Sequence, residues 1–196
     1  MPPGNAPDGQ PPAAGRLPHA RLYPLLLGAR CEELAPLLRE VHQSAHLLRG
    51  SVTVTRGATW AARLLAEMAR LPRPCANAPC VVRFEQRSDW PAGTERWVRE
   101  IAGRHFVSRL MPVGHVAFDE SFGWYRFRFT LELDNGAVRF VLRGFSVLGV
   151  PVPRCLHPRV STRESQQGEE YLFKVEAGLP GVGLLVAYHG RLRVQS

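Results

Sequence analysis

Two adjacent acids, Asp119 and Glu120, and the nearby Tyr125 are the side chains of this sequence best suited to moving a proton. Adjacent side chains of a strand point to opposite faces, so the two carboxyl groups would not act on one substrate together. Either of them, if buried, could act alone as a general acid or base. We therefore predict Asp119, Glu120 and Tyr125 as candidate catalytic residues, and leave open whether the chain is an enzyme.

The segment at 124–144 supplies the candidate binding groups. Its apolar residues alternate with arginines, and the Asn135-Gly136 pair is a strong signal for a tight hairpin turn. Counting outward from this turn sets Arg128 opposite Arg143 on the face that points away from the apolar side. Two facing cations are unfavourable unless an anion compensates them.

Three uses of this Arg-rich face stay open. The arginines could extend into water, or they could be covered by acidic side chains of other segments, such as Asp119, Glu120 or Glu164. They could also bind a carboxylate ligand, since the guanidinium fork fits that group well. We predict five ligand-binding residues, either on this face or as polar groups of an apolar pocket: Trp124, Arg126, Arg128, Arg143 and Tyr188.

Signatures of well-known enzyme classes are missing from the sequence. There is no P-loop, no G-x-S-x-G elbow and no H-E-x-x-H motif. The stretch GLPGVG at 178–183 has the wrong order of glycines for a dinucleotide fingerprint and is expected to be a turn. His42 and His46 lack a third ligand nearby, and Cys75 and Cys80 lack a second cysteine pair. We expect neither a metal nor a cofactor.

The composition is that of an ordinary globular domain with a basic charge balance. The 196 residues are 45% hydrophobic and 21% charged, with a net charge of +8. Lys174 is the only lysine, and the arginines are scattered rather than gathered in a run, so nucleic-acid binding is not expected. The sequence shows no membrane-span pattern and no export signal, which favours a cytoplasmic protein with reduced cysteines. The prolines and glycines of residues 1–19 predict a disordered tail, followed by one domain over 20–196.

Helical patterns come first along the chain. A short helix over 21–27 is expected to end at Gly28, and Pro36 suits the first turn of a second helix. The apolar spacing of residues 58–71 predicts a third helix, which would pack into the core through five side chains: Trp60, Leu64, Leu65, Met68 and Leu71.

Alternating patterns follow, and they determine the predicted fold class. A strand is expected within GSVTVTRG, and from Cys80 onward the pattern alternates throughout, with a hairpin that turns at Ala102-Gly103. There is no βαβ alternation, and the sequence ends in a strand pattern. We predict an α+β fold in which N-terminal helices pack on a strongly curved antiparallel sheet or incomplete β-barrel of about eight to nine strands.

Most of the chain resembles a bacterial domain of unknown function. The resemblance is carried, in this order, by LYPLLLG, LLREVH, GSVTVTRG, RWVREIAGRHFVSRL, FRFTLELDNGAVRFVLRGFSVLGVPVPRCLHPRVSTRE and VEAGLPGVGLLVAYHGRL. It spans about Leu22 to Leu192 and consists of turn and strand patterns. The family also occurs fused behind saccharopine-dehydrogenase-like, NAD-binding reductases, so the resemblance implies a reductase as a partner. It implies no catalytic residues.

These features favour a barrel-like container for an apolar compound, lipid-like or polyketide-like, lined by the sheet and the 58–71 helix. Such a container could act as a cofactor-independent cyclase or isomerase of biosynthesis, because folding a flexible substrate requires little more than shaped walls and one acid. The alternative is a non-catalytic interaction module that docks to a reductase or another acidic partner through the Arg-rich face.

Overall fold

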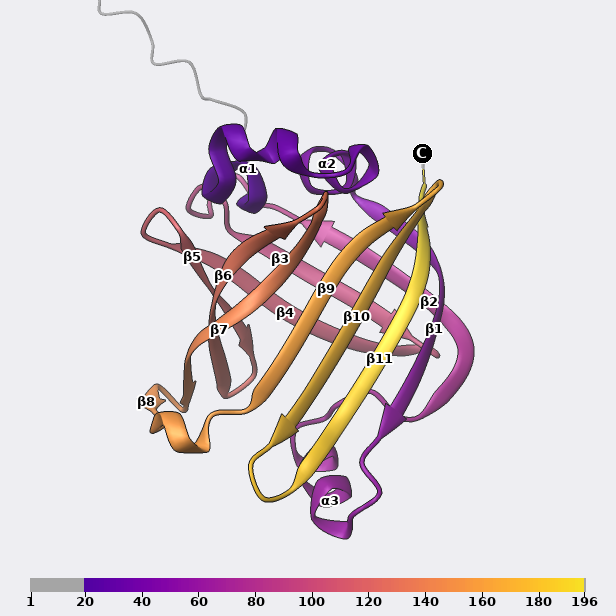
Figure 1. Cartoon of the computed structure of the whole chain (residues 1–196), viewed down its shortest axis with the longest axis vertical. Coiled ribbons are helices and arrows are strands. Elements are labelled where there is room, and N and C mark those ends of the chain that lie inside the picture. The colour runs from indigo at the N-terminus through magenta and orange to yellow at the C-terminus, as the bar shows by residue number, and fades with distance from the viewer. Residues whose placement is uncertain (1–19, 196) are drawn as a thin grey trace, which may run out of the picture.

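The alternating segments form long strands that pair with their neighbours, as Figure 1 shows for the computed structural model, which describes residues 20–195. The predicted tail over 1–19 lies outside the described residues. The strands are β1 (Leu47–Arg56), β2 (Cys75–Glu85), β3 (Glu95–Ile101), β4 (Arg104–Val113), β5 (Ala117–Phe122), β6 (Tyr125–Asp134), β7 (Ala137–Val147), β8 (Val150–Pro151), β9 (Arg159–Gln167), β10 (Glu170–Leu179) and β11 (Gly183–Val194).

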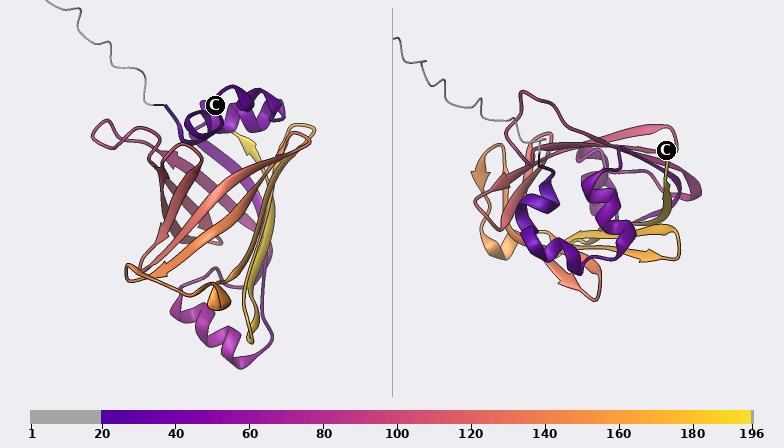
Figure 2. Two further views of the ribbon diagram at one scale, coloured as in Figure 1. Left: turned by 60° about the vertical axis from the view of Figure 1, so that its left-hand side comes forward. Right: turned by 90° about the horizontal axis from the view of Figure 1, so that it is seen from above.

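Ten of these strands close into an antiparallel barrel, and the short β8 pairs only with β7. Two pairings between distant parts of the chain complete the ring: β1 pairs with β11, and β7 pairs with β9. The predicted antiparallel curvature is thus confirmed, but the predicted eight to nine strands are too few, and the barrel is complete. The difference comes from β1, which precedes the third helix yet pairs with both β2 and β11 (Figure 2).

The β6–β7 hairpin follows the predicted register only near its turn. Asn135 and Gly136 both have positive φ, as the tight turn requires. The pairs nearest the turn are those predicted, but a bulge after Arg128 shifts the register, so that Arg128 lies opposite Gly144 instead of Arg143. The bulge separates the two like charges that were predicted to face each other.

The N-terminal helices cover one end of the barrel, called the upper end here because it lies at the top of Figure 1. Gly28, with φ of 54°, ends the first helix, and Pro36 begins the second α-helix, as predicted. Leu38 and Val41 are fully buried in the core that these helices share with the barrel. The three elements are α1 (Leu22–Leu27), the 3₁₀ helix η1 (Gly28–Glu33) and α2 (Pro36–Gln43).

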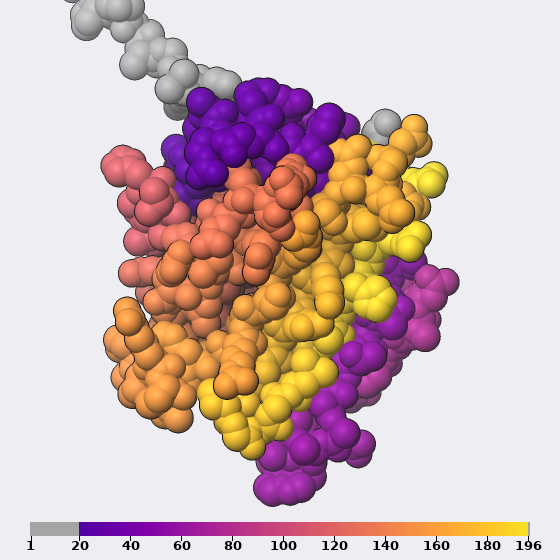
Figure 3. Space-filling view, in the orientation of Figure 1, coloured from indigo at the N-terminus to yellow at the C-terminus, as the bar shows by residue number. Residues whose placement is uncertain are grey.

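The helix α3 (Trp60–Met68) lies at the opposite, lower end of the barrel (Figure 3). Most of the prediction that its apolar side chains pack into the core is wrong. Its buried residues are Ala62 and Ala66, while Leu65 and Leu71 border the barrel interior. A short helix across a barrel end touches the strands along one narrow strip, and no other segment of the described residues 20–195 covers its far side. Three predicted core residues are therefore exposed, at 79%, 53% and 66%: Trp60, Leu64 and Met68.

Other local predictions hold. The β3–β4 hairpin turns at Ala102-Gly103, and residues 180–182 form the turn between β10 and β11.

A further 3₁₀ helix, η2 (Arg154–Leu156), follows β8 at the lower end. Among residues 20–195, none of the helices is long and apolar enough to cross a membrane. The four cysteines are all free thiols: Cys31, Cys75, Cys80 and Cys155.

Candidate ligand-binding site

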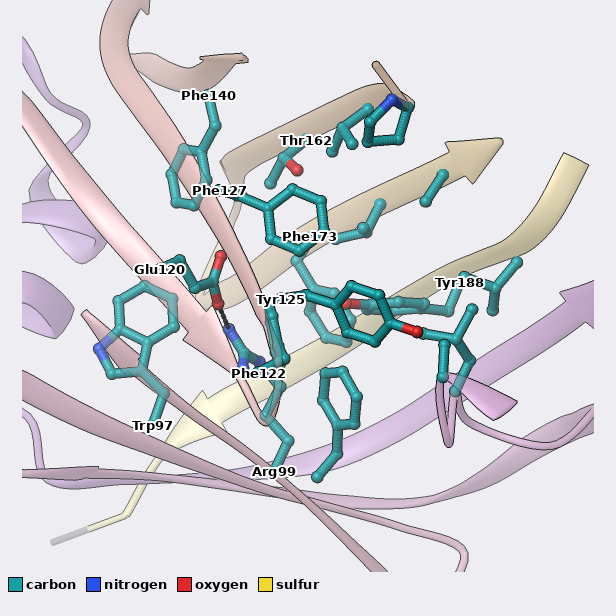
Figure 4. A pocket seen from close by; sticks show the side chains of 18 of the residues that line it. Trp97, Arg99, Glu120, Phe122, Tyr125, Phe127, Phe140, Thr162, Phe173 and Tyr188 are labelled. Atoms are coloured by element: carbon teal, nitrogen blue, oxygen red, sulfur yellow. Dashed lines mark hydrogen bonds and ion pairs between the residues drawn. The ribbon is translucent and has the colours of Figure 1, made fainter. Parts of the chain in front are cut away.

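The barrel encloses a cavity of about 360 Å³ with an aromatic wall (Figure 4). Alternation along each strand sends every second side chain inward, and eight of the nine phenylalanines reach this wall. Trp97, Tyr171 and Tyr188 add further aromatic surface. Ligand pockets in proteins measure roughly 300–1,000 Å³, so this cavity suits a small, largely apolar compound.

The cavity is covered at the upper end and borders solvent at the lower end. Phe84 and Trp97 are buried there beneath the N-terminal helices, next to His42 of α2. At the lower end, the side chains of Phe122 and Tyr125 line the cavity but are only partly buried. The lower end is therefore the more exposed end of the cavity, and we call it the mouth.

An ion pair between two cavity-lining residues stands within the apolar wall. Arg99 of β3 and Glu120 of β5 lie 3.4 Å apart (Nη2 to Oε1), and their side chains are 14% and 7% exposed. Arg99 Nη1 also donates a hydrogen bond to Ser108 Oγ at 2.8 Å. The guanidinium lies over the Trp97 ring, 5.1 Å from its centroid, where the ring face attracts a cation. Arg99 is thus held from three sides while it faces the cavity (Figure 4).

Burial sets the charge states of these groups. It raises the pKa of the Glu120 carboxyl, and the charge of Arg99 lowers that pKa only in part. Burial also disfavours the charged form of Arg99, but the carboxylates and tyrosines around it raise its pKa, so it stays a cation. The Tyr188 hydroxyl is neutral, because burial raises its pKa to about 12. These three groups thus present a fixed cation, a weakened acid and a neutral phenol to the cavity.

A second polar group joins the upper cover to the wall of the cavity. Glu164 of β9 accepts hydrogen bonds from Tyr23 Oη at 2.7 Å and from His42 Nε2 at 2.8 Å. An ionised carboxylate can only accept, so Nε2 of His42 carries the proton. Burial alone would raise the pKa of Glu164, but His42 and the two hydrogen bonds hold it below its usual value. The rings of Tyr23 and His42 stack at 3.5 Å, which fixes α1 against α2.

A third polar group anchors the start of α1 on β3. Glu95 accepts hydrogen bonds from Arg21 Nε at 3.2 Å, from the Leu22 amide at 3.0 Å and from Trp97 Nε1 at 2.7 Å. Arg21 and Glu95 are both buried, but neither lines the cavity. Their role is to hold the cover in place.

The predicted catalytic residues separate in the structure. Glu120 and Tyr125 line the cavity, and so does the predicted binding residue Tyr188. Asp119 projects to the outer face, where Arg128 donates to both of its carboxylate oxygens, at 2.8 and 3.1 Å. Glu120 and Asp119 point to opposite sides of β5, as the alternation predicts.

The remaining predicted binding residues lie outside the barrel. Trp124 and Arg126 are exposed, and Arg143 donates hydrogen bonds to Thr130 at 3.0 Å and to Glu132 at 3.2 Å. Three uses of the Arg-rich face were considered above. For Arg128 the structure shows the second one, pairing with an acidic side chain. That acid is Asp119, since Glu120 and Glu164 point inward.

Several interior residues had no predicted role in a binding site. Arg99 shares one strand face with Trp97 and Ile101, and Glu164 shares one with Thr162. For both residues, the sequence signal was a charged side chain that falls on the apolar face of a strand. Nothing local marks the others as neighbours, because elements far apart in sequence bring them together. These residues are Tyr23, His42 and Tyr171.

Comparisons with known proteins give a family for the chain and a solved structure that aligns with it. The model of a family described as "Domain of unknown function (DUF4166)" matches residues 34–192. No curated protein matches the chain. The crystal structure of Rv2717c from M. tuberculosis aligns over 83% of this chain and 99% of that one, with 12% identity and a TM-score of 0.48.

Proposed function

Since the chain belongs to the DUF4166 family, whose description assigns no activity, we propose a function from the cavity: it binds an apolar, lipid-like compound that carries an acidic head group. The observation that carries this proposal is the aromatic cavity with one buried guanidinium, Arg99, on its wall. The apolar body of the ligand would replace water along the phenylalanines, and its carboxylate would pair with Arg99.

Arg99 can change partners at low cost. Its contact with Glu120 is long, at 3.4 Å, and burial already favours the neutral form of that carboxyl. A ligand carboxylate could therefore take the guanidinium while Glu120 accepts a proton. Glu120 would then donate a hydrogen bond to the ligand instead of repelling it.

The test is a binding titration with a fluorescent fatty acid and with its methyl ester. Arg99→Met should weaken binding of the acid about 10- to 100-fold, because a hydrogen bond to a charged group contributes about 1.5–3 kcal/mol. Binding of the ester should change little. The double variant Arg99→Met/Glu120→Gln removes any effect of an unpaired carboxyl, and Arg126→Met, on the outer face, is the matched control. Equal affinity of the acid for the wild type and both Arg99 variants would refute the proposal.

Native mass spectrometry of the purified protein is a second test, and it also addresses catalysis. A buried carboxyl with a raised pKa can deliver a proton inside an apolar container, so Glu120 favours a cyclase or isomerase as a second candidate function. If that function holds, Glu120→Gln should retain a substrate whose mass or fragmentation differs from that of the compound retained by the wild type. If both proteins retain the same compound, the result supports binding without catalysis.

The docking alternative has weaker support. Arg128 and Arg143, the predicted centre of the Arg-rich face, are engaged with Asp119 and Glu132 on the same sheet. A reductase partner remains a prediction that rests on the family resemblance.

A further inference from the structure

Large apolar side chains project from the mouth end of the barrel. We define the lower rim as residues 57–74, 102–104, 123–124, 148–159 and 180–184, which are α3 and the turns at this end (Figure 1). Seven of its large apolar side chains are more than half exposed: Trp60, Leu64, Met68, Trp124, Leu148, Val150 and Leu156. They belong to α3, to the turn after β5 and to the segment from the β7–β8 turn to η2, rather than to one compact patch. In Figure 3, α3 and the β8 segment form two separate protrusions at the lower end.

The lower rim is also the cationic end of the molecule. It contains six arginines (Arg63, Arg70, Arg73, Arg104, Arg154 and Arg159) and one acid, Glu67. Within residues 20–195, only Arg73 of these arginines forms an ion pair. The upper end has the opposite balance: residues 28–46, 86–94, 114–116, 134–136 and 168–170 contain seven carboxylates and three arginines.

We propose that the lower rim docks onto the surface of an anionic phospholipid bilayer, with the mouth of the cavity against the membrane. This inference rests on the proposed function. A bilayer is wide and flat, so it can receive apolar side chains that stand apart around an opening, and tryptophan is favoured at its interface. The arginines match the negative charge of the lipid head groups, and the acidic upper end orients the barrel. An apolar ligand could then pass between bilayer and cavity without crossing water.

The experiment is co-sedimentation of the full chain with vesicles of phosphatidylcholine, with or without phosphatidylglycerol. We expect binding to the anionic vesicles that weakens with salt. Arg63→Glu/Arg154→Glu should lower the partition coefficient by about 30-fold or more, since each basic residue near an anionic surface strengthens binding roughly fivefold. Arg49→Glu/Arg139→Glu makes the same charge change on exposed arginines outside the rim, and should retain most of the binding.

Intrinsic fluorescence gives an independent reading of the apolar contacts. Anionic vesicles should shift the emission of the wild type to the blue, and Trp60→Ser/Trp124→Ser should lose both the shift and most of the sedimentation. Val116→Ser, an exposed apolar residue at the upper end, is the control. All these positions are exposed, so we expect each variant to fold. A circular dichroism melt checks this.

The outcomes separate this inference from the proposed function. No binding to anionic vesicles, or equal binding by the rim and control variants, overturns docking. Even when docking is overturned, the proposed function stands if the fatty acid binds in vesicle-free solution. Rim-dependent vesicle binding by a protein that binds no fatty acid supports docking and overturns the proposed function.

Discussion

Removal of one hydroxyl, in Tyr23→Phe, tests whether the upper cover is held by a charged hydrogen-bond network. Tyr23 Oη donates to Glu164 Oε2 at 2.7 Å, and these two residues are only 1% and 3% exposed. A hydrogen bond to a charged group contributes about 1.5–3 kcal/mol. For a chain of this size, that corresponds to a fall in Tm of about 3–12 °C.

The same variant should change the dependence of stability on pH. Because the pKa of Glu164 is held low in the folded state, its contribution is present above the pKa of the unfolded state and is lost as pH falls through the folded pKa. Loss of the Tyr23 donor raises the folded pKa toward its usual value, so the variant loses this stability at a higher pH. The difference between the two proteins should be largest near neutrality and shrink between about pH 5 and pH 2.

The assay is urea unfolding followed by circular dichroism across this pH range. Tyr125→Phe is the control, because Tyr125 lies at the mouth and its hydroxyl forms no hydrogen bond within the described part of the chain. Its free energy of unfolding should change by about 0.5 kcal/mol or less. A loss in Tyr23→Phe no larger than this, or one that is constant with pH, would refute the role assigned to Glu164.

Two further predictions concern the anchor of α1 and the thiols. Arg21→Met leaves Glu95 as an unpaired buried charge and should lower the free energy of unfolding by about 3–5 kcal/mol, whereas Arg143→Met, in an exposed pair, should lower it by roughly 1 kcal/mol or less in the same urea assay. If both variants lose the same free energy of unfolding, the buried pair of Arg21 and Glu95 has no special role in anchoring α1. Cys155 is exposed and should react first with a thiol reagent at pH 8, while Cys80, whose pKa burial raises to about 11, should react only on unfolding; fast labelling that survives Cys155→Ser would contradict this.

Local features were predicted well where local physics decides them. The Asn135-Gly136 turn needs positive φ at both residues, and alternation then sets the register for several pairs. The bulge after Arg128 lies beyond the reach of this argument, since it depends on how β6 and β7 bend to fit the barrel. The helix over Trp60–Met68 was also predicted, but its apolar spacing could not show that only one side of it would be covered.

The candidate site was predicted only in part. Glu120, Tyr125 and Tyr188 were expected in a pocket and line the cavity, but Arg99, the cation that gives the cavity its chemical character, was not among the candidates. Alternation reveals which residues share a strand face, but it leaves open which of the two faces is enclosed. That is decided when the strands curl and the helices cover one end.

By itself, the sequence determined the strands, the tight turns, the antiparallel class and the apolar character of one sheet face, because hydrophobic periodicity and turn chemistry act over a few residues. Only the tertiary structure decided the closure of the ring, through β1 with β11 and β7 with β9, and the meeting of Tyr23, His42 and Glu164. Glu164 is separated from each of these two partners by more than 100 residues. Such contacts form only when the whole barrel closes and buries them together, so no short stretch of sequence carries their signal.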